Sequence, residues 1–319
     1  MADAVMRGDA AAVRRLLSEQ ADVNAPQADG ATALHWAVYR DDLATVELLL
    51  TAGADAKVAN SFGSTPLSLA AETGNPVVTR RLLDAGADAN ERLLNGETVL
   101  MMAARTGNVA TMALLLDRGA DLNAREASRG TTALMWAASQ GHPAAVQLLV
   151  DHGADVSAVS DPAWQARPVR YAKAVDPRPS RKRDNSNVVS QIGPRNQRDA
   201  RGGGLTPLVF AVRANDLESV RLLLAAGADV NQVTNYGWSP LLVATQNRHY
   251  QIAAFLLDRG ADPNVANNGA WTPLYLAVDN RNIEGGDYPV RKADMDTLEY
   301  IKTLIDKGAN VNWRVDEST

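Results

Sequence analysis

The fold is decided by a stretch that runs from residue 32 to residue 57, TALHWAVYRDDLATVELLLTAGADAK. It contains two apolar stretches with polar residues between them. Apolar residues three and four positions apart, as at Val46, Leu49 and Leu50, predict an amphipathic helix. The glycine of Gly53-Ala54-Asp55 predicts the end of that helix, because glycine takes a positive φ just past a helix C-terminus at little cost. The stretch therefore predicts two short helices followed by a stop.

The same pattern returns along most of the chain, usually after 33 or 34 residues. The Gly-Ala-Asp motif or its Gly-Ala-Asn variant begins at Gly53, Gly86, Gly119, Gly153, Gly227, Gly260 and Gly308. A second motif, which places Leu two residues after Thr or Ser, begins at Thr32, Thr65, Thr98, Thr132, Thr206, Ser239 and Thr272. Thr or Ser is a good N-cap, and proline in second place, as in Thr65-Pro66, is tolerated at the first helical position. Two motifs with one period predict a repeat architecture.

This unit resembles the ankyrin repeat, and the segments Leu34-His35-Trp36-Ala37 and Gly227-Ala228-Asp229-Val230-Asn231 match the family pattern almost letter by letter. The resemblance is closest to bacterial ankyrin-repeat proteins of unassigned function. It implies an all-α solenoid of about eight helix-turn-helix units with β-hairpin-like fingers, forming a single array over residues 1–319. The expected units span about 1–24, 25–57, 58–90, 91–123, 124–157, 204–231, 232–264 and 265–312. The family histidine is replaced in other units, by Ser68 and Met101 among others, which puts its supporting hydrogen bond in question there.

Two insertions interrupt the period. The first, residues 158–203, lies within a finger and contains ten Lys and Arg but four Asp, so it carries +6 and leaves −11 for the rest of the chain. Its cluster Arg181-Lys182-Arg183 and its content of Pro, Ser, Asn and Gly predict a basic, flexible loop. The second, residues 280–294, falls between the two helices of the last unit. We expect the two insertions on opposite edges of the array.

Composition excludes several classes of protein. No apolar run approaches the roughly 18 to 20 residues of a membrane-spanning helix, so we expect no membrane span. The absence of cysteine excludes disulfides and thiolate metal sites, but it does not identify the compartment. The N-terminal sequence lacks the apolar core of a secretion signal, which leaves the cytoplasm, or the periplasm or exterior if a signal was removed. A net charge of −5 argues against a protein built to coat nucleic acid, which we regard as an unlikely partner.

Sequence motifs for catalysis or cofactor binding are absent. No dinucleotide loop, P-loop, nucleophile elbow or zinc-protease motif occurs, and Gly202-Gly203-Gly204 is not followed by Lys-Thr. We interpret the four histidines as structural, and the repeated Asp55, Asp88 and Asp121 as loop-stabilising, because each unit supplies one. The sequence therefore predicts no enzyme, no cofactor and no metal site.

The remaining candidate is a binding surface. The resemblance implies that fingers and first helices line a concave face that binds a partner protein, as a scaffold or adaptor, and we expect a monomer. Trp238 and Trp271 directly precede consecutive Ser-Pro and Thr-Pro motifs and are predicted to lie side by side, in an aromatic patch with Phe62 and Tyr236 at neighbouring finger tips. The predicted partner-binding residues are Tyr39, Arg40, Phe62, Arg105, Gln140, Arg213, Tyr236, Trp238, Gln246 and Trp271. Trp36 and Trp136, by contrast, are expected to pack in the core.

Three alternatives stay open from sequence alone. Trp238 and Trp271 could each pack over the neighbouring hairpin as a local staple. The basic insertion could be a solvated linker, or an arm that binds anions or nucleic acid. The chain could also be a targeting module cut from a larger protein, because Val311-Asn312-Trp313 resembles the opening of a ninth finger.

Overall fold

The computed structural model describes residues 1–162, 202–282 and 292–315. The helices in these ranges are α1 (Ala2–Arg7), α2 (Ala10–Ser18), α3 (Ala33–Tyr39), α4 (Leu43–Thr51), α5 (Pro66–Thr73), α6 (Pro76–Asp84), α7 (Val99–Thr106), α8 (Val109–Asp117), α9 (Ala133–Gln140), α10 (Pro143–Asp151), α11 (Pro207–Arg213), α12 (Leu217–Ala225), α13 (Pro240–Gln246), α14 (Tyr250–Asp258), α15 (Pro273–Asn282) and α16 (Thr297–Asp306). The all-α repeat solenoid predicted from the sequence is confirmed.

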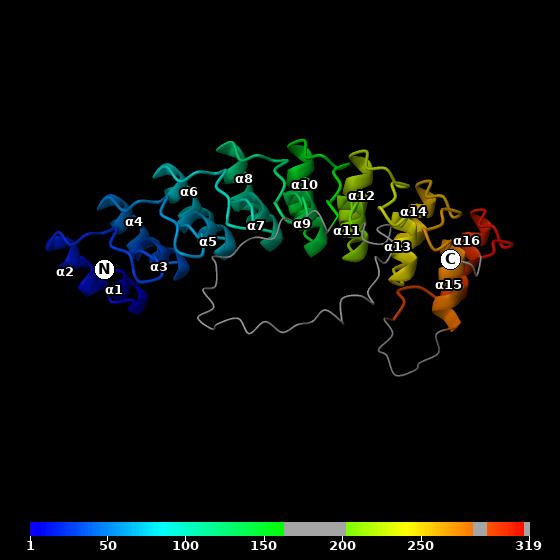
Figure 1. The fold of residues 1–319 in the computed structure, drawn as a ribbon, viewed down its shortest axis with the longest axis horizontal. Coiled ribbons are helices and arrows are strands. Elements are labelled where there is room, and N and C mark those ends of the chain that lie inside the picture. Colours follow the sequence, from blue (N-terminus) through cyan, green and yellow to red (C-terminus); the bar gives the residue numbers. More distant parts are fainter. Residues whose placement is uncertain (163–201, 283–291, 316–319) are drawn as a thin grey trace, which may run out of the picture.

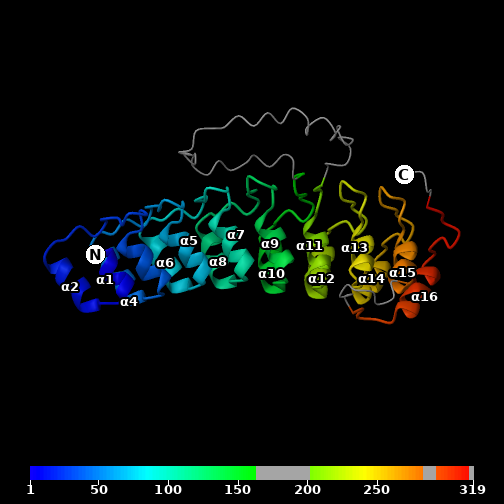
Figure 2. The same cartoon turned by 60° about the horizontal axis from the view of Figure 1, so that its bottom comes forward.

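The helices form two rows in a curved array. The even-numbered helices follow the convex edge, and the odd-numbered helices lie inside them (Figure 1). The fingers project from one end of the helix layer (Figure 2). The fingers and the inner helices therefore share one surface, which we call the concave face.

Most helices begin at a residue whose side chain caps the first turn, whereas α1, α10 and α14 have no side-chain cap. In the inner row the Thr98 hydroxyl accepts the backbone N–H of Met101 at 3.3 Å. In the outer row the Asn108 side chain accepts the backbone N–H of Thr111 at 2.9 Å. Such caps satisfy N–H groups that a helix leaves without a partner in its first turn. Helices of six to ten residues are too short to be stable alone, so packing between units must supply most of their stability.

The core repeats with the sequence. Each inner helix from α3 to α13 buries the leucine of its Thr-x-Leu or Ser-x-Leu motif, and each outer helix from α4 to α14 buries at least one leucine against it. These fully buried leucines include Leu34, Leu67, Leu100, Leu134, Leu208 and Leu241 in the inner row and Leu49, Leu82, Leu115, Leu149, Leu223 and Leu256 in the outer row. One continuous core therefore runs through the described units, and small alanines between the leucines allow the helices to approach closely.

The fingers are tight turns. The backbone N–H of Asn60 donates to Ser64 O at 2.9 Å, and Leu93 donates to Glu97 O at the same distance. Neighbouring fingers are joined by single bonds, such as Ser61 N–H to Asp29 O at 2.8 Å. Apart from one isolated antiparallel bridge, between Arg92 and Thr98, the described residues contain no strand. The fingers are therefore hairpin-like in path without forming a sheet.

Asparagines join consecutive units on the convex side. Asn90 donates its side-chain amide to Gly119 O at 2.9 Å and accepts the backbone N–H of Asp121 at 2.7 Å. Asn24, Asn231 and Asn264 make the same pair of bonds to the unit that follows. We call this arrangement the asparagine clip. At the same position of its unit Lys57 replaces asparagine, and no clip is formed there.

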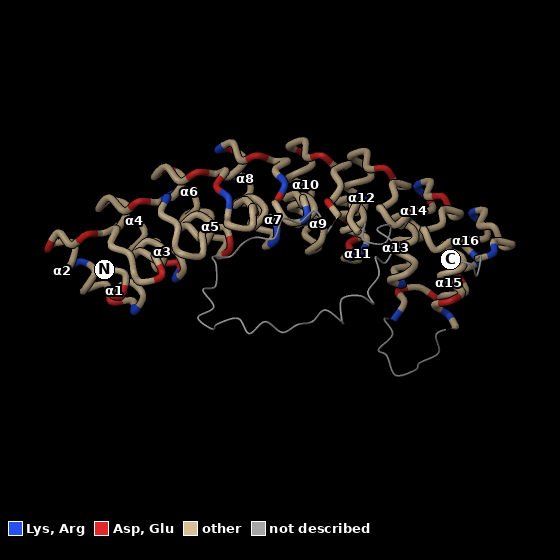
Figure 3. Tube along the Cα trace, viewed as in Figure 1, with Lys and Arg blue, Asp and Glu red and all other residues tan. Residues whose placement is uncertain are grey.

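The repeated aspartates have a local role. The Asp88 carboxylate accepts the backbone N–H of Asn90 at 2.9 Å, and Asp55 and Asp121 accept the corresponding N–H groups at 2.8 and 3.1 Å. Figure 3 shows acidic residues recurring along the links between units on the convex edge. These carboxylates close turns and lie one per unit, so they do not form a catalytic pair.

The described ends of the two insertions lie on different parts of the array. Asp161 and Gly203, near the two ends of the first insertion, lie within the fingers, where Asp161 N–H donates to Arg129 O at 2.6 Å. In the second insertion, the described residues up to Asn282 end α15, on the side of the helix layer away from the fingers (Figure 2). These positions agree with the expected separation.

Candidate functional site

Equivalent positions of successive units form columns on the concave face. The residue four positions after each Thr or Ser cap includes Trp36, Trp136 and Phe210, and these side chains are half-buried against the core. The residue seven positions after the cap includes Arg105, Ser139 and Arg213. A binding surface is thus assembled from single residues of separate units, each positioned by a short rigid helix.

A groove of about 900 Å³ lies on this face between the fingers and the helices α7, α9 and α11. It brings together three of the predicted binding residues, Arg105, Gln140 and Arg213. The small Ser139 stands in the column between the two arginines, and Trp136 and Phe210 supply apolar wall. A groove of this size, with apolar walls and a few polar groups, has the character of a binding site.

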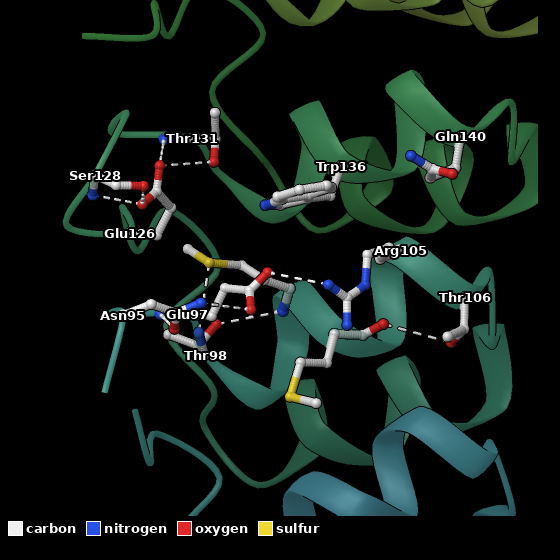
Figure 4. A network of polar contacts seen from close by, with 12 residues as sticks. Asn95, Glu97, Thr98, Arg105, Thr106, Glu126, Ser128, Thr131, Trp136 and Gln140 are labelled. Atoms are coloured by element: carbon white, nitrogen blue, oxygen red, sulfur yellow. Dashed lines mark hydrogen bonds and ion pairs between the residues drawn. The ribbon is translucent and has the colours of Figure 1, made fainter. Parts of the chain in front are cut away.

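A network of polar contacts shapes one wall of the groove (Figure 4). Arg105 pairs with the buried carboxylate of Glu97 at 3.5 Å, and Asn95 donates to the other oxygen of Glu97 at 3.0 Å. The Arg105 guanidinium also lies over the Trp136 ring, with its Cζ 5.8 Å from the centroid, so a cation–π contact holds both side chains. The wall is therefore preorganised.

Trp36 and Trp136 pack against the core, as expected, but neither is fully buried. Both are half-buried on the concave face, and Trp136 lines the groove. Trp36 donates its indole N–H to Gln27 Oε1 at 2.6 Å. Glu126 occupies the place of Gln27 in the unit of Trp136, since each donates its backbone N–H to the residue before the cap, Ala31 or Thr131. The Glu126 carboxylate accepts bonds within its own finger, and the Trp136 Nε1 atom has no hydrogen-bond partner among the described residues. Only the structure distinguishes these two tryptophans.

A second cluster lies towards the C-terminal end of the array. The Trp238 and Trp271 rings meet edge to face with their centroids 6.4 Å apart, as their consecutive positions predict. Tyr275 stacks on Trp271 at 6.3 Å, and Trp271 and Tyr275 are 39% and 42% exposed. We call Trp238, Trp271 and Tyr275 the aromatic cluster. Tyr275 replaces the family histidine, and no feature of the sequence predicted its exposure.

The aromatic cluster continues the column that lines the groove. The residue before each cap is Glu97, Thr131 or Leu205 in the groove, and it is Trp238 and Trp271 in the next two units. The cluster and the groove are consequently parts of the same face.

The other predicted residues are scattered. Phe62 is 71% exposed in the finger that follows α4, whereas Tyr236 lies in the finger that follows α12, so the expectation that they occupy neighbouring fingers is wrong. At the N-terminal end, Tyr39 contacts the Trp36 ring edge to face at 5.8 Å, and Arg40 donates to Met6 O at 3.3 Å. Gln246 is exposed at the end of α13, outside the groove. Arg181, Lys182 and Arg183 of the basic insertion lie outside the described residues.

The histidines all make contacts with backbone carbonyls. Nε2 of His35 donates to Ser64 O at 3.0 Å while its Nδ1 accepts the Thr32 N–H at 3.1 Å, and burial lowers its pKa. His142, His152 and His249 each approach one carbonyl oxygen at 2.8 to 3.1 Å. Within the described ranges no group of three or more His, Asp or Glu is placed to bind a metal ion.

In the units where Ser68 and Met101 replace the family histidine, the backbone N–H of the cap threonine still has a side-chain acceptor. The Ser68 hydroxyl accepts the Thr65 N–H at 2.9 Å, and the Met101 sulfur accepts the Thr98 N–H at 3.4 Å. The Thr65 hydroxyl donates a hydrogen bond to the carboxyl group of Glu91, which lies at the start of the following unit. Burial raises the pKa of Glu91 to about 7, although the bond from Thr65 opposes the rise.

Comparison with known proteins agrees with this architecture. A family model described as ankyrin repeats, in three copies, matches residues 1–92, 76–160, 181–267 and 208–314. The chain belongs to the ankyrin-repeat family. Ankyrin repeats generally mediate protein–protein interaction, and the family consists of non-catalytic interaction modules. No curated protein sequence matches the chain.

Among solved structures, this ankyrin-repeat chain is similar to the ankyrin repeat domain of Bcl-3, described as a unique member of the IkappaB protein family. The two are 27% identical with a TM-score of 0.59, and the match covers 87% of this chain and 99% of the Bcl-3 chain. None of the helices in the described part of this protein has the length and apolar character needed to cross a bilayer.

Proposed function

We propose that this ankyrin-repeat protein is a scaffold or adaptor that binds a partner protein through its concave face and performs no catalysis. The observation that carries the proposal is the aromatic cluster of Trp238, Trp271 and Tyr275. Two of its three rings are more than a third exposed, although water contact is unfavourable for such large apolar surfaces. Exposed tryptophan and tyrosine held in fixed geometry are typical of the residues that dominate the binding energy of protein interfaces.

The proposal is tested with the full chain and with the double variant Trp271→Ala/Tyr275→Ala as baits for affinity capture. We expect a captured protein to be lost with the double variant, and its purified form to bind at least about 30-fold more weakly, because interface hot spots contribute about 2 kcal/mol or more. The matched control is Val77→Ala/Leu298→Ala, which removes exposed apolar side chains from the outer helices α6 and α16. Thermal unfolding of both variants checks that the array stays folded. Unchanged binding by a folded Trp271→Ala/Tyr275→Ala variant would contradict the proposal.

The alternative role in anion or nucleic-acid binding depends on the basic insertion. Residues 163–201 lie outside the described part of the chain, so no observed geometry favours that function. It stays a prediction from sequence.

A further inference from the structure

The groove contains three acidic side chains, and each already has partners within the chain. Glu97 pairs with Arg105 and accepts from Asn95. Asp161 pairs with Arg125 at 2.9 Å. Glu126 accepts bonds from its own finger, including the Arg129 N–H at 2.6 Å and the Thr131 hydroxyl at 3.1 Å. Burial alone would raise the pKa of Glu126, but these bonds and those from Ser128 hold it below its ordinary value, so it remains a carboxylate.

The cationic side chains of the groove are in a different situation. Arg105 is engaged by Glu97, whereas the guanidinium groups of Arg129 and Arg213 make no hydrogen bond or ion pair with any described residue. Both side chains are exposed and line the groove from opposite elements, a finger tip and the end of α11. The groove therefore offers free, permanently charged donors and no free carboxylate.

The wall between these arginines is apolar. Trp136, Phe210 and Leu205 are half-buried and present the parts of their side chains that the core does not cover. A ligand that fits the groove must therefore satisfy two guanidinium groups and also cover apolar surface. Carboxylates are the protein groups that pair best with arginine, because two N–H donors match two oxygens.

We infer that the groove binds an acidic segment of the partner protein, in which Asp or Glu residues flank at least one apolar side chain. The carboxylates pair with Arg129 and Arg213, and the apolar side chain packs on Trp136 and Phe210. This inference rests on the proposed function, since it specifies the partner of the same concave face. The chain's own insertion does not meet the requirement, because residues 163–201 contain ten Lys and Arg but three Asp.

The test uses a library of random dodecapeptides displayed on phage and selected on the full chain. Enriched peptides are synthesised with a fluorescent label and titrated against the full chain and its variants. We expect Asp and Glu to be enriched, next to an apolar residue, among the peptides that compete for the groove. Arg129→Ala and Arg213→Ala should each weaken their binding about tenfold or more, because a hydrogen bond to a charged group contributes about that factor.

Two variants separate the groove from general charge effects. Arg14→Ala/Arg80→Ala removes two arginines from the outer helices α2 and α6 and should leave peptide affinity within about twofold. Glu97→Gln keeps the shape of the side chain but releases Arg105 from its ion pair, so it should tighten the binding of acidic peptides severalfold. A gain in affinity cannot result from misfolding.

The possible outcomes test the acidic-segment inference separately from the proposed function. Binders that are lost with Trp271→Ala/Tyr275→Ala but unaffected by Arg129→Ala and Arg213→Ala would overturn the acidic-segment inference and leave the proposed function intact. Groove-dependent binders without an excess of Asp and Glu would overturn the inference as well. A labelled single-stranded oligonucleotide that bound the groove more tightly than the peptides would replace it with nucleic-acid binding. If no selected peptide responded to either set of variants, both proposals would fail.

Discussion

Trp136 and Trp36 occupy the same position of their repeats, yet only Trp36 has an acceptor for its indole N–H. The difference originates in the finger before each helix, where Gln27 accepts that N–H at 2.6 Å, whereas Glu126 at the equivalent position accepts bonds from Ser128, Arg129 and Thr131 of its own finger. A shielded donor without a partner costs free energy, because its hydrogen bond to water is lost on folding. The unit of Trp136, which contributes most to the groove, therefore lacks a stabilising hydrogen bond that the unit of Trp36 has.

Replacing each tryptophan by phenylalanine should reveal this asymmetry. Both variants lose a similar apolar area, but Trp36→Phe also breaks a hydrogen bond and leaves the Gln27 oxygen without that donor. We expect the free energy of unfolding to fall by about 1 kcal/mol more for Trp36→Phe than for Trp136→Phe. Urea titration of the full chain measures the difference. Equal losses would show that the bond from Trp36 to Gln27 adds no net stability.

The sequence was sufficient to predict the helices, their caps and the adjacency of Trp238 and Trp271, because each follows from residues at fixed positions of one repeat or of two consecutive repeats. It was not sufficient to predict the groove. The groove requires a small Ser139 between Arg105 and Arg213, and its free charges depend on which carboxylates are already paired, as Glu97 is with Arg105. The exposure of Tyr275 was also missed, because its counterpart His35 is buried and bonded to Ser64 O of the next finger. The groove, its free charges and the exposure of Tyr275 depend on which residues are neighbours in space and not on the repeat pattern.

Stability should depend on pH through Glu91. Burial raises its pKa to about 7 in the folded protein, above the ordinary value of 4.5, so the folded state binds this proton more tightly than the unfolded chain does. The resulting stabilisation is complete below about pH 4.5 and is lost as the pH rises to about 7. We expect Glu91 alone to lower the free energy of unfolding by up to about 3 kcal/mol between pH 4.5 and pH 8. Urea titrations of the native chain across this range measure the slope.

The Glu91→Gln variant isolates that contribution. The amide cannot ionise, so the variant should unfold at higher urea concentration than the native chain at pH 8 and should show a flatter pH profile. Glu72→Gln is the matched control, since Glu72 is an exposed glutamate of the neighbouring inner helix α5. A native and a Glu91→Gln profile that run parallel from pH 5 to pH 8 would exclude ionisation of Glu91 as the cause.

The asparagine clip should contribute to the coupling between units. One substitution that removes a clip and another that adds one can measure this contribution. Asn90→Ala removes two hydrogen bonds, to Gly119 O and from Asp121 N–H, and should cost about 1 to 2 kcal/mol at an exposed site. Lys57→Asn introduces the same side chain at a joint that lacks a clip, where Gly86 O and Asp88 N–H occupy the equivalent places. We expect it to stabilise the array by about 1 kcal/mol, and hydrogen exchange should show added protection of the amides around Gly86. If Lys57→Asn left both the unfolding midpoint and that protection unchanged, the clip would be a consequence of unit stacking and not one of its causes.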